Sequence, residues 1–408
     1  MKKIVNPVQV IPNIEPRSFS KAPCSSAFSQ KPCTSQSLSK DSMLAHSKLP
    51  DGANPQKIIV ILGPNASGKS EMAVKIAKKF NGEIISADSR QVYKGLDIGT
   101  GKVEGVWKTV KTINSDKLRH GIVCQNLENQ CKRIFIYKNI PHYCIDFVSP
   151  KKVYSAGEFK KCGQKAIDDI IKKGKLPIFC GGTGFYIEAA LDMIKLPGIP
   201  ADWKLRKKLE KKSSEQLFKM LQKLDPSRAK NIDPKNKRRL VRAIEITASP
   251  DTKCQNELFR HPMPELNALF LGITHDPEIL KKRIERRLLA RIKQGMIKEV
   301  ENLHKKWLSW KRLDDLGLEY RWISLYLKKI NKIKKAYKMR GRNFSMQSKS
   351  TYDEMIAKLN VEIRRYAKRQ MTWFGGLNSR LKKENNRIYW IKNQKDAEKL
   401  IITFISYR

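Results

Sequence analysis

The chain has 408 residues, with 83 Lys or Arg against 39 Asp or Glu, so its formal charge is +44 at pH 7. This length allows one large core with a smaller attached domain, and the positive charge favours a nucleic-acid partner, although an AT-rich genome would also enrich Lys, Ile and Asn. The chain has no apolar run of about 18 residues, which excludes a membrane-spanning helix. Its eight scattered cysteines predict a reducing compartment and no zinc site.

The N-terminal segment, residues 1–55, is rich in Ser, Pro and Lys and lacks helical or strand periodicity. We therefore expect a disordered extension. It has no continuous apolar region of the kind found in a secretory signal, so we expect a cytoplasmic protein. A Ser-rich, acid-poor start leaves an organellar transit peptide as the alternative.

A phosphate-binding loop follows the first predicted strand, residues 57–62, and precedes a predicted helix, 69–79, with Gly82 as its stop signal. The loop residues are Gly63, Pro64, Asn65, Ala66, Ser67, Gly68, Lys69 and Ser70. The glycines let backbone N–H groups face phosphate oxygens, Lys69 adds a positive charge, and the Ser70 hydroxyl can reach Mg2+. We expect this loop, called the cradle below, to hold a diphosphate or triphosphate rather than to be an empty turn.

A carboxylate, Asp88, comes directly after the second predicted strand, residues 83–87. Parallel strands of a doubly wound sheet end at one edge, so Asp88 should lie beside the cradle. It could bind Mg2+ or act as a general base. Capping of a helix or turn is the alternative for an aspartate in this place.

A second glycine-rich turn ends in Thr183, after the predicted strand 176–180, and should open at the same edge of the sheet. The Thr183 hydroxyl could contact a ligand, or it could cap the predicted helix 184–191. Phe185 and Tyr186 could offer a stacking surface, but aromatic residues at helix starts are more typical of core.

The C-terminal part returns to the sheet with a predicted strand at 269–273. Asp276 and Pro277, an N-cap and an N1 proline, then begin a helix that carries Arg283, Arg286 and Arg287. We expect Arg283 and Arg286 to face solvent or tRNA. The later predicted elements are a helix opened by the capping box 351–354, a strand at 387–391 and a helix near 394–406.

Several sequence blocks, in a fixed order, resemble the tRNA dimethylallyltransferase family, the isopentenyl transferases that act on adenosine. The blocks are the cradle and residues 88–100, 141–142, 154–159, 181–186, 317–321 and 367–374. The resemblance implies an α/β fold with a P-loop NTPase-like parallel sheet flanked by helices and an inserted helical domain. Without a C-terminal zinc finger, the chain looks more like the bacterial form.

The same resemblance implies a domain order. Residues 56–191 would form the P-loop core, 192–265 a helical insertion that contacts tRNA, and 266–408 the completion of the core with C-terminal helices. Two segments, near 102–140 and 328–350, have no counterpart in many relatives, and we expect surface loops there.

The implied reaction transfers a dimethylallyl group from dimethylallyl diphosphate to N6 of the adenosine 3′ of the anticodon in tRNA. The cradle, with Arg287 and with Mg2+ near Ser70, would hold the diphosphate, because charge builds on the leaving oxygens. Asp88 would take the proton of the attacking amine, and Lys69 and Thr183 would complete the catalytic residues.

The residues implied to contact tRNA are Asp88, Ser89, Arg90, Gln91, Thr183, Arg206, Arg238, Arg239 and Arg242. In the segment 233–245, helical spacing puts Arg238 and Arg242 on one face and Leu240 and Ile244 on another that can pack on protein. The target base would have to leave the loop stack to reach a buried carboxylate. We expect a monomer.

Three other functions remain open from the sequence. A prenyltransferase for free adenine nucleotides would share the core, and a small-molecule kinase would share the cradle. A non-catalytic RNA-binding protein would use the charge without needing Asp88.

Overall fold

The computed structural model of the protein describes residues 57–111, 131–249, 267–340 and 345–406. The extension predicted at residues 1–55 lies outside the described residues. Within these ranges no helix combines the length and the apolar character needed to cross a bilayer.

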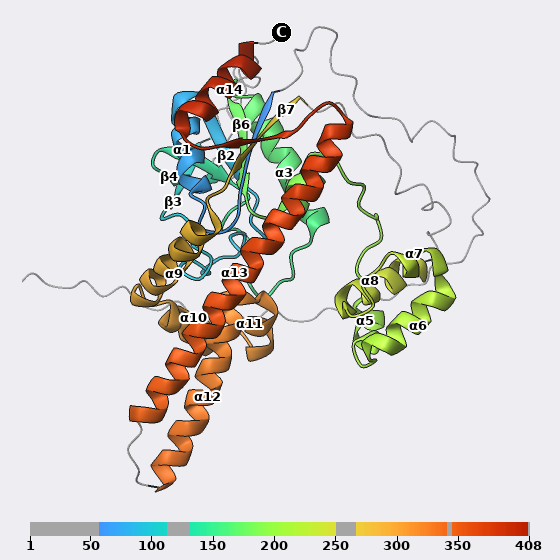
Figure 1. Ribbon diagram of the computed structural model, residues 1–408, viewed down its shortest axis with the longest axis vertical. Coiled ribbons are helices and arrows are strands. Elements are labelled where there is room, and N and C mark those ends of the chain that lie inside the picture. The colour runs from blue at the N-terminus through green and yellow to red at the C-terminus, as the bar shows by residue number, and fades with distance from the viewer. Residues whose placement is uncertain (1–56, 112–130, 250–266, 341–344, 407–408) are drawn as a thin grey trace, which may run out of the picture. The chain divides into compact units, whose positions relative to one another are not determined.

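The centre of the described chain is a mixed sheet of eight strands in the order β3-β4-β5-β2-β6-β1-β7-β8 (Figure 1). The strands are β1 Ile58–Leu62, β2 Gly82–Ser86, β3 Val106–Lys111, β4 Cys131–Tyr137, β5 Ile140–Tyr143, β6 Leu176–Gly181, β7 Ala268–Ile273 and β8 Ile388–Ile391. In the part of the sheet that runs in the order β5-β2-β6-β1-β7-β8, all neighbouring strands pair in parallel, as predicted. The strands β3 and β4 pair antiparallel, so the sheet is not parallel throughout.

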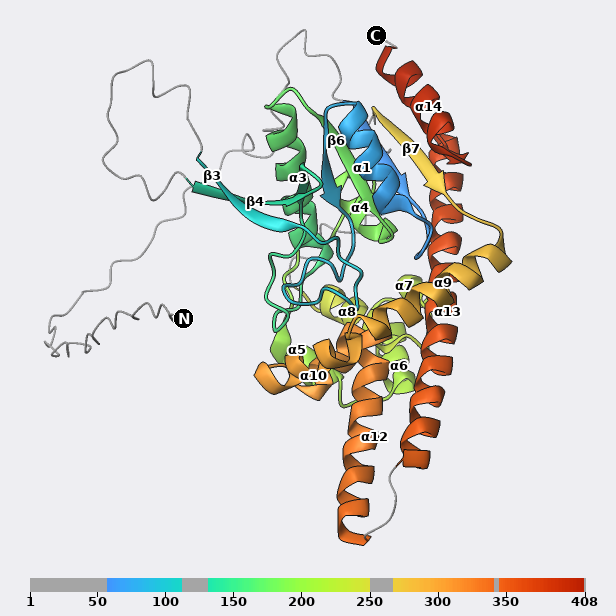
Figure 2. The same ribbon diagram turned by 90° about the vertical axis from the view of Figure 1, so that its left-hand side faces the viewer.

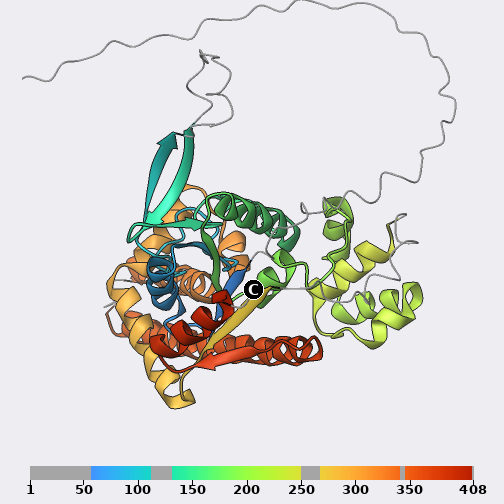
Figure 3. The ribbon, with the colours of Figure 1, turned by 90° about the horizontal axis from the view of Figure 1, so that it is seen from above.

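These two antiparallel strands correct one expectation. The segment near 102–140 was expected to be a surface loop, but its two ends form β3 and β4 and continue the sheet beyond β5 (Figures 2 and 3). Residues 112–130, between the strands, lie outside the described residues.

Helices cover both faces of the sheet, which explains the continuous apolar run of β1. Val60 and Leu62 pack into one hydrophobic cluster, with α3 Ala156–Ile171, α4 Gly184–Ala190 and α13 Ser345–Lys383. Ile59 and Ile61 pack into another, with α1 Lys69–Lys79 and α14 Gln394–Ser406. A strand buried on both faces does not alternate apolar and polar residues.

Further helices follow β7: α9 Pro277–Lys293, α10 Met296–Lys306, α11 Trp310–Leu316 and α12 Leu318–Arg340. Figures 1 and 2 show α12 and α13 side by side. The surface loop expected at 328–350 is therefore wrong, because the described part of that segment belongs to these two helices. Ile330 and Met355 are buried in their shared cluster. The capping box expected to begin a helix at Thr351 is also wrong, since Thr351 is buried inside α13.

The region between residues 192 and 265 contains its own helices (Figure 1). They are α5 Trp203–Leu209, α6 Ser214–Leu224, α7 Pro226–Lys230 and α8 Lys237–Thr247. Side chains at their N-caps explain where all four begin, because Asp202, Ser213, Asp225 and Asn236 each accept a backbone N–H of the first turn. Leu217 and Leu240 belong to the hydrophobic cluster of these helices. The boundaries of the predicted domains stay a prediction.

Candidate active site

The cradle joins β1 to α1 with the bounds that the sequence predicted for that helix. Gly68 has φ 95°, a left-handed conformation that favours glycine. A Cβ at Gly63 would lie 2.4 Å from the Ile273 carbonyl oxygen, so only glycine fits there. The first N–H groups of α1 have no acceptors within the helix, and no side chain of the described residues caps them. The stop signal was misplaced by one residue: Asn81, with φ 48°, makes the turn, and Gly82 begins β2.

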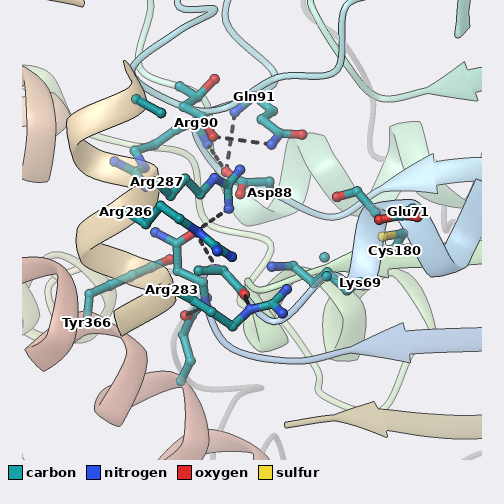
Figure 4. A pocket seen from close by; sticks show the side chains of 18 residues that line it. Lys69, Glu71, Asp88, Arg90, Gln91, Cys180, Arg283, Arg286, Arg287 and Tyr366 are labelled. Carbon is teal, nitrogen blue, oxygen red and sulfur yellow. Dashed lines mark hydrogen bonds between the residues drawn. The ribbon is translucent and has the colours of Figure 1, made fainter. Parts of the chain in front are cut away.

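A cavity of about 480 Å³ opens at the cradle, where positive side chains outnumber carboxylates (Figure 4). The positive side chains that line it are Lys69, Arg90, Arg283, Arg286 and Arg287. The carboxylates are Glu71 and Asp88. Figure 4 shows the arginines of α9 on the side of the pocket opposite Lys69. Such a lining suits a ligand with several negative charges.

The pKa values of two of these groups reflect the shortage of negative charge. Burial lowers the pKa of Lys69 below its ordinary value, and the neighbouring Arg287 adds to that effect. Burial, with Arg291 next to it, lowers the pKa of Arg287 to about 10. A bound anion would favour the charged forms of both groups.

Only some of the predicted site residues line the cavity; Ser89, Thr183 and the predicted arginines of the helical region do not. Those that line the cavity are Asn65, Ala66, Gly68, Lys69, Ser70, Asp88, Arg90, Gln91 and Arg287. Gly63, Pro64 and Ser67 shape the turn behind it, and the Pro64 carbonyl oxygen accepts a hydrogen bond from Lys69 Nζ at 3.2 Å. Ser67 Oγ is a buried oxygen without a hydrogen-bond partner among the described residues.

Asp88 combines the two roles that the sequence left open. Its Oδ1 accepts hydrogen bonds from the backbone N–H groups of Arg90 at 2.9 Å and Gln91 at 3.3 Å, so it does cap the turn after β2. The same carboxylate lines the cavity. Capping therefore fixes the position of Asp88 beside the cradle, while its role as a base stays a prediction.

Thr183 does not cap α4, and that alternative is wrong. Its Oγ1 instead accepts a hydrogen bond from the Ser89 backbone N–H at 3.1 Å, which ties the loop after β6 to the loop after β2. Tyr186 is core, as expected, and stacks on Phe159 with ring centres 4.2 Å apart. Phe185 is 40% exposed and lies edge-on to Trp373, so the core expectation is wrong for it.

Arg90 has a buried partner that the sequence did not indicate. Its Nη1 lies 2.5 Å from Glu319 Oε2, and the Glu319 side chain is fully buried. Burial alone would lower the pKa of Arg90, but Glu319 and Asp88 outweigh it and raise that pKa. Glu319, at the start of α12, is thus a site residue that belonged to a recognised block but had no assigned role.

Three more residues that line the cavity, Arg283, Arg286 and Gln370, were missed. Arg283 and Arg286, which we expected to face solvent or tRNA, both line the cavity, and Arg283 donates from Nε to the Ala66 carbonyl oxygen at 2.9 Å. Its spacing of four residues from Arg287 places both on one face of α9, a signal present in the sequence. Gln370 lines the cavity from α13 and had no role either.

The donor set fits a magnesium ion that is bound together with its phosphate ligand. Among the described residues no three His, Cys, Asp or Glu side chains form a metal-binding group. The Ser70 hydroxyl and the Asp88 carboxylate both line the cavity. Mg2+ commonly takes one or two protein oxygens and completes its shell with substrate phosphates and water.

Three of the four predicted tRNA-contacting arginines in the helical region have intramolecular partners. Arg206 donates from Nε and Nη2 to Glu245, at 2.8 and 2.7 Å, and Arg242 pairs with the same carboxylate. Arg238 is 80% exposed and lies 2.9 Å from Asp315, and Arg239 is exposed. The predicted faces of α8 are confirmed, because Leu240 and Ile244 are buried in the cluster of this region. Contact of these arginines with tRNA stays a prediction.

Comparison with known proteins identifies the family. Residues 56–131 match the family model described as Isopentenyl transferase, and residues 134–377 match the model described as IPP transferase. A tRNA dimethylallyltransferase of Acetivibrio thermocellus is 37% identical over 358 residues, which is 86% of this chain and 96% of that protein. The tRNA dimethylallyltransferase 1 of Geotalea uraniireducens is 36% identical over 343 residues, 84% of this chain and 94% of that protein.

A solved structure supports the fold. A eukaryotic dimethylallyltransferase acting on tRNA superimposes with a TM-score of 0.59 at 24% identity, over 82% of this chain and 73% of that chain. The predicted α/β fold, P-loop NTPase-like with helices around the sheet, is confirmed. The chain belongs to the IPP transferase family, as its sequence blocks predict.

Proposed function

We propose that this chain transfers a dimethylallyl group from dimethylallyl diphosphate to N6 of the adenosine 3′ of the anticodon in tRNA. The observation that carries the proposal is the cavity in which positive side chains surround the cradle while Asp88 lies on its wall. The relatives reported above are named tRNA dimethylallyltransferases, so the reaction is one of prenyl transfer.

The leaving group departs within the positive part of the cavity. As the bond between the allylic carbon and the diphosphate oxygen breaks, negative charge grows on the diphosphate. Lys69 and Arg287 stabilise that charge together with the first N–H groups of α1. A Mg2+ ion held by the diphosphate and the Ser70 hydroxyl would neutralise part of the same charge.

The nucleophile approaches from the side of Asp88. N6 of the adenine forms the new bond to the allylic carbon, and its proton passes to the Asp88 carboxylate. The base has to leave the anticodon-loop stack to enter the cavity. The hydrogen bond between Thr183 and Ser89 fixes the two loops that would border the adenine.

The tRNA anticodon stem-loop is the proposed macromolecular partner. The formal charge of +44 supports attraction to a phosphate backbone, and affinity should weaken steeply as salt rises. Arg239 is exposed, and the exposed Arg238 would exchange its ion pair with Asp315 for a phosphate. Prenylation of free adenine nucleotides is the second candidate, because it uses the same cavity.

We also propose a cytoplasmic monomer. The curated relatives reported above are bacterial, which supports the cytoplasm. A transit peptide within residues 1–55 would instead direct the chain to an organelle, and fluorescence imaging of the chain with a C-terminal tag would distinguish the two locations.

Incubation of the purified protein with dimethylallyl diphosphate, Mg2+ and unmodified tRNA, followed by nucleoside mass spectrometry, tests the proposal. We expect prenylated adenosine from tRNA, and no product from AMP in competition with tRNA. Lys69→Ala should lower kcat by about 10²-fold or more, because it removes a half-buried cation at the leaving group, while tRNA affinity stays nearly unchanged. Full turnover by Lys69→Ala, or formation of ADP from ATP in place of prenylated product, would contradict the assignment.

A further inference from the structure

Gln370 connects two loops of the site through one side-chain amide. It lies on α13 and is 6% exposed. Its Oε1 accepts a hydrogen bond from the Asn65 backbone N–H at 2.8 Å, and its Nε2 donates to the Gly182 carbonyl oxygen at 2.9 Å. One side chain therefore satisfies a donor of the cradle and an acceptor of the loop that follows β6.

The two loops that it joins continue neighbouring strands. β1 and β6 pair in parallel up to Leu62 and Gly181, after which each chain turns away from the ladder. The first loop holds the cradle, and the second leads to Thr183. A Cβ at Gly182 would lie 2.2 Å from Gln370 Nε2 and 3.5 Å from the Gly63 carbonyl oxygen, which shows how closely both loops approach this amide.

The amide is held on a firmly packed element. Ala367 and Phe374, about one turn away on either side, are buried in the main hydrophobic cluster. The same helix contacts α4 through buried Glu188. This carboxylate accepts a hydrogen bond from Trp373 Nε1 at 2.5 Å and forms an ion pair with Arg380 at 2.7 Å. Gln370 cannot shift without disturbing these contacts.

The bond to Asn65 extends to the arginines of α9. The Asn65 side-chain oxygen accepts a hydrogen bond from Arg287 Nη1 at 3.1 Å, and from the Ala66 backbone N–H at 3.1 Å. The position of Asn65, fixed from one side by Gln370, thus determines where Arg287 meets the cradle. This chain of contacts joins α13, the cradle and α9.

We propose that Gln370 is a positioning residue that sets the separation between the diphosphate cradle and the loop bordering the acceptor base. The inference rests on the proposed function, in which the leaving group occupies the first loop and the adenine lies against the second. Reacting atoms that are misplaced by about 1 Å can lose about 10²-fold in rate, whereas the binding of each substrate to its own loop need not change.

Two variants test the inference. Gln370→Met keeps the length of the side chain and removes both hydrogen bonds, whereas Gln370→Glu keeps an acceptor for Asn65 and removes the donor to Gly182. We expect each to lower kcat for tRNA prenylation by about 10- to 100-fold, with KM for dimethylallyl diphosphate and KM for tRNA within about threefold of wild type. Thr372→Ala is the matched control, because Thr372 is an exposed residue of the same helix whose hydroxyl donates to the Lys368 carbonyl oxygen within α13.

The outcomes separate the inference from the function on which it rests. If wild type prenylates tRNA and both Gln370 variants, shown to be folded by thermal melting, keep its kcat, the positioning role is wrong. A rise in KM alone would also overturn it, because that result would make Gln370 a binding residue. If wild type yields no prenylated tRNA, the proposed function fails first, and the inference with it.

Discussion

Two groups of arginines in this protein show opposite electrostatic arrangements. In the helical region, Arg206 and Arg242 share the carboxylate of Glu245, which is only 3% exposed. In the cavity, Arg283 and Arg287 lie near Lys69, and positive charge exceeds negative charge. The residue type is the same, but the balance of charge around it differs.

The pKa shifts follow that difference. Burial alone would raise the pKa of Glu245, but hydrogen bonds from Arg206 and Arg242 outweigh it and lower that pKa. In the cavity the pKa of Arg287 falls to about 10 through burial and the neighbouring Arg291. Compensated arginines stabilise the fold, whereas an excess of buried positive charge marks a place for an anionic ligand.

The largest effect is expected for Arg287, which should serve ligand binding and not stability if the comparison is correct. Arg287→Gln should lower kcat/KM for dimethylallyl diphosphate by about 10²- to 10³-fold, because it removes a charged donor from the leaving group. The free energy of unfolding should stay the same or rise, because burial and the neighbouring Arg291 destabilise the charged form of Arg287 in the folded protein. Steady-state kinetics and urea denaturation of the same preparation measure both quantities. A variant that loses stability but keeps full kcat/KM would show that Arg287 serves the fold.

For Glu245 we expect the opposite: substitution should lower stability and leave ligand binding at the cradle unchanged. Glu245→Gln leaves two guanidinium groups without their buried carboxylate, which should cost about 2–3 kcal/mol in local stability. The measurement is amide hydrogen exchange of α5 to α8, with Glu210→Gln, an exposed residue of the same region, as the control. Binding of inorganic pyrophosphate at the cradle should not change. Unaltered exchange in Glu245→Gln would mean that its arginines are free to serve another partner.

The comparison also shows which parts of the molecule sequence patterns can predict. The cradle, β1, α1 and Asp88 were predicted because their signals are local: an apolar run, glycines at turns and a carboxylate directly after a strand. The helices over 328–350 were missed because abundant lysines obscured the apolar spacing of Leu327 and Ile330, which are buried against α13. Propensity was the better guide there, since Lys, Ala and Met all favour helix.

Two of the missed site residues, Glu319 and Gln370, were missed for the same physical reason. Arg90 and Glu319 are 229 positions apart in the chain, and Asn65 and Gln370 are 305 apart. No periodicity or motif encodes such a pairing, because tertiary folding alone brings the two side chains together. Arg242 and Glu245 are different: their spacing of three residues on one helix is visible in the sequence and indicates an ion pair.

The smallest expected effect is a loss, at acidic pH, of the stability that Glu245 contributes. It tests whether the arginines of the helical region, unlike those of the cavity, are compensated by charge. Because the pKa of Glu245 is lowered in the folded protein from the ordinary 4.5, its contribution to stability is complete above that pH and disappears as pH falls through the folded-state pKa. The stability difference between wild type and Glu245→Gln should therefore be constant near neutral pH and shrink below 4.5. Hydrogen-exchange protection of α5 to α8, measured from about pH 6 to about pH 3.5, gives that difference directly. A difference that persists unchanged to the lowest pH would show that the amide substitution acts through packing and that the shared charge does not stabilise this region.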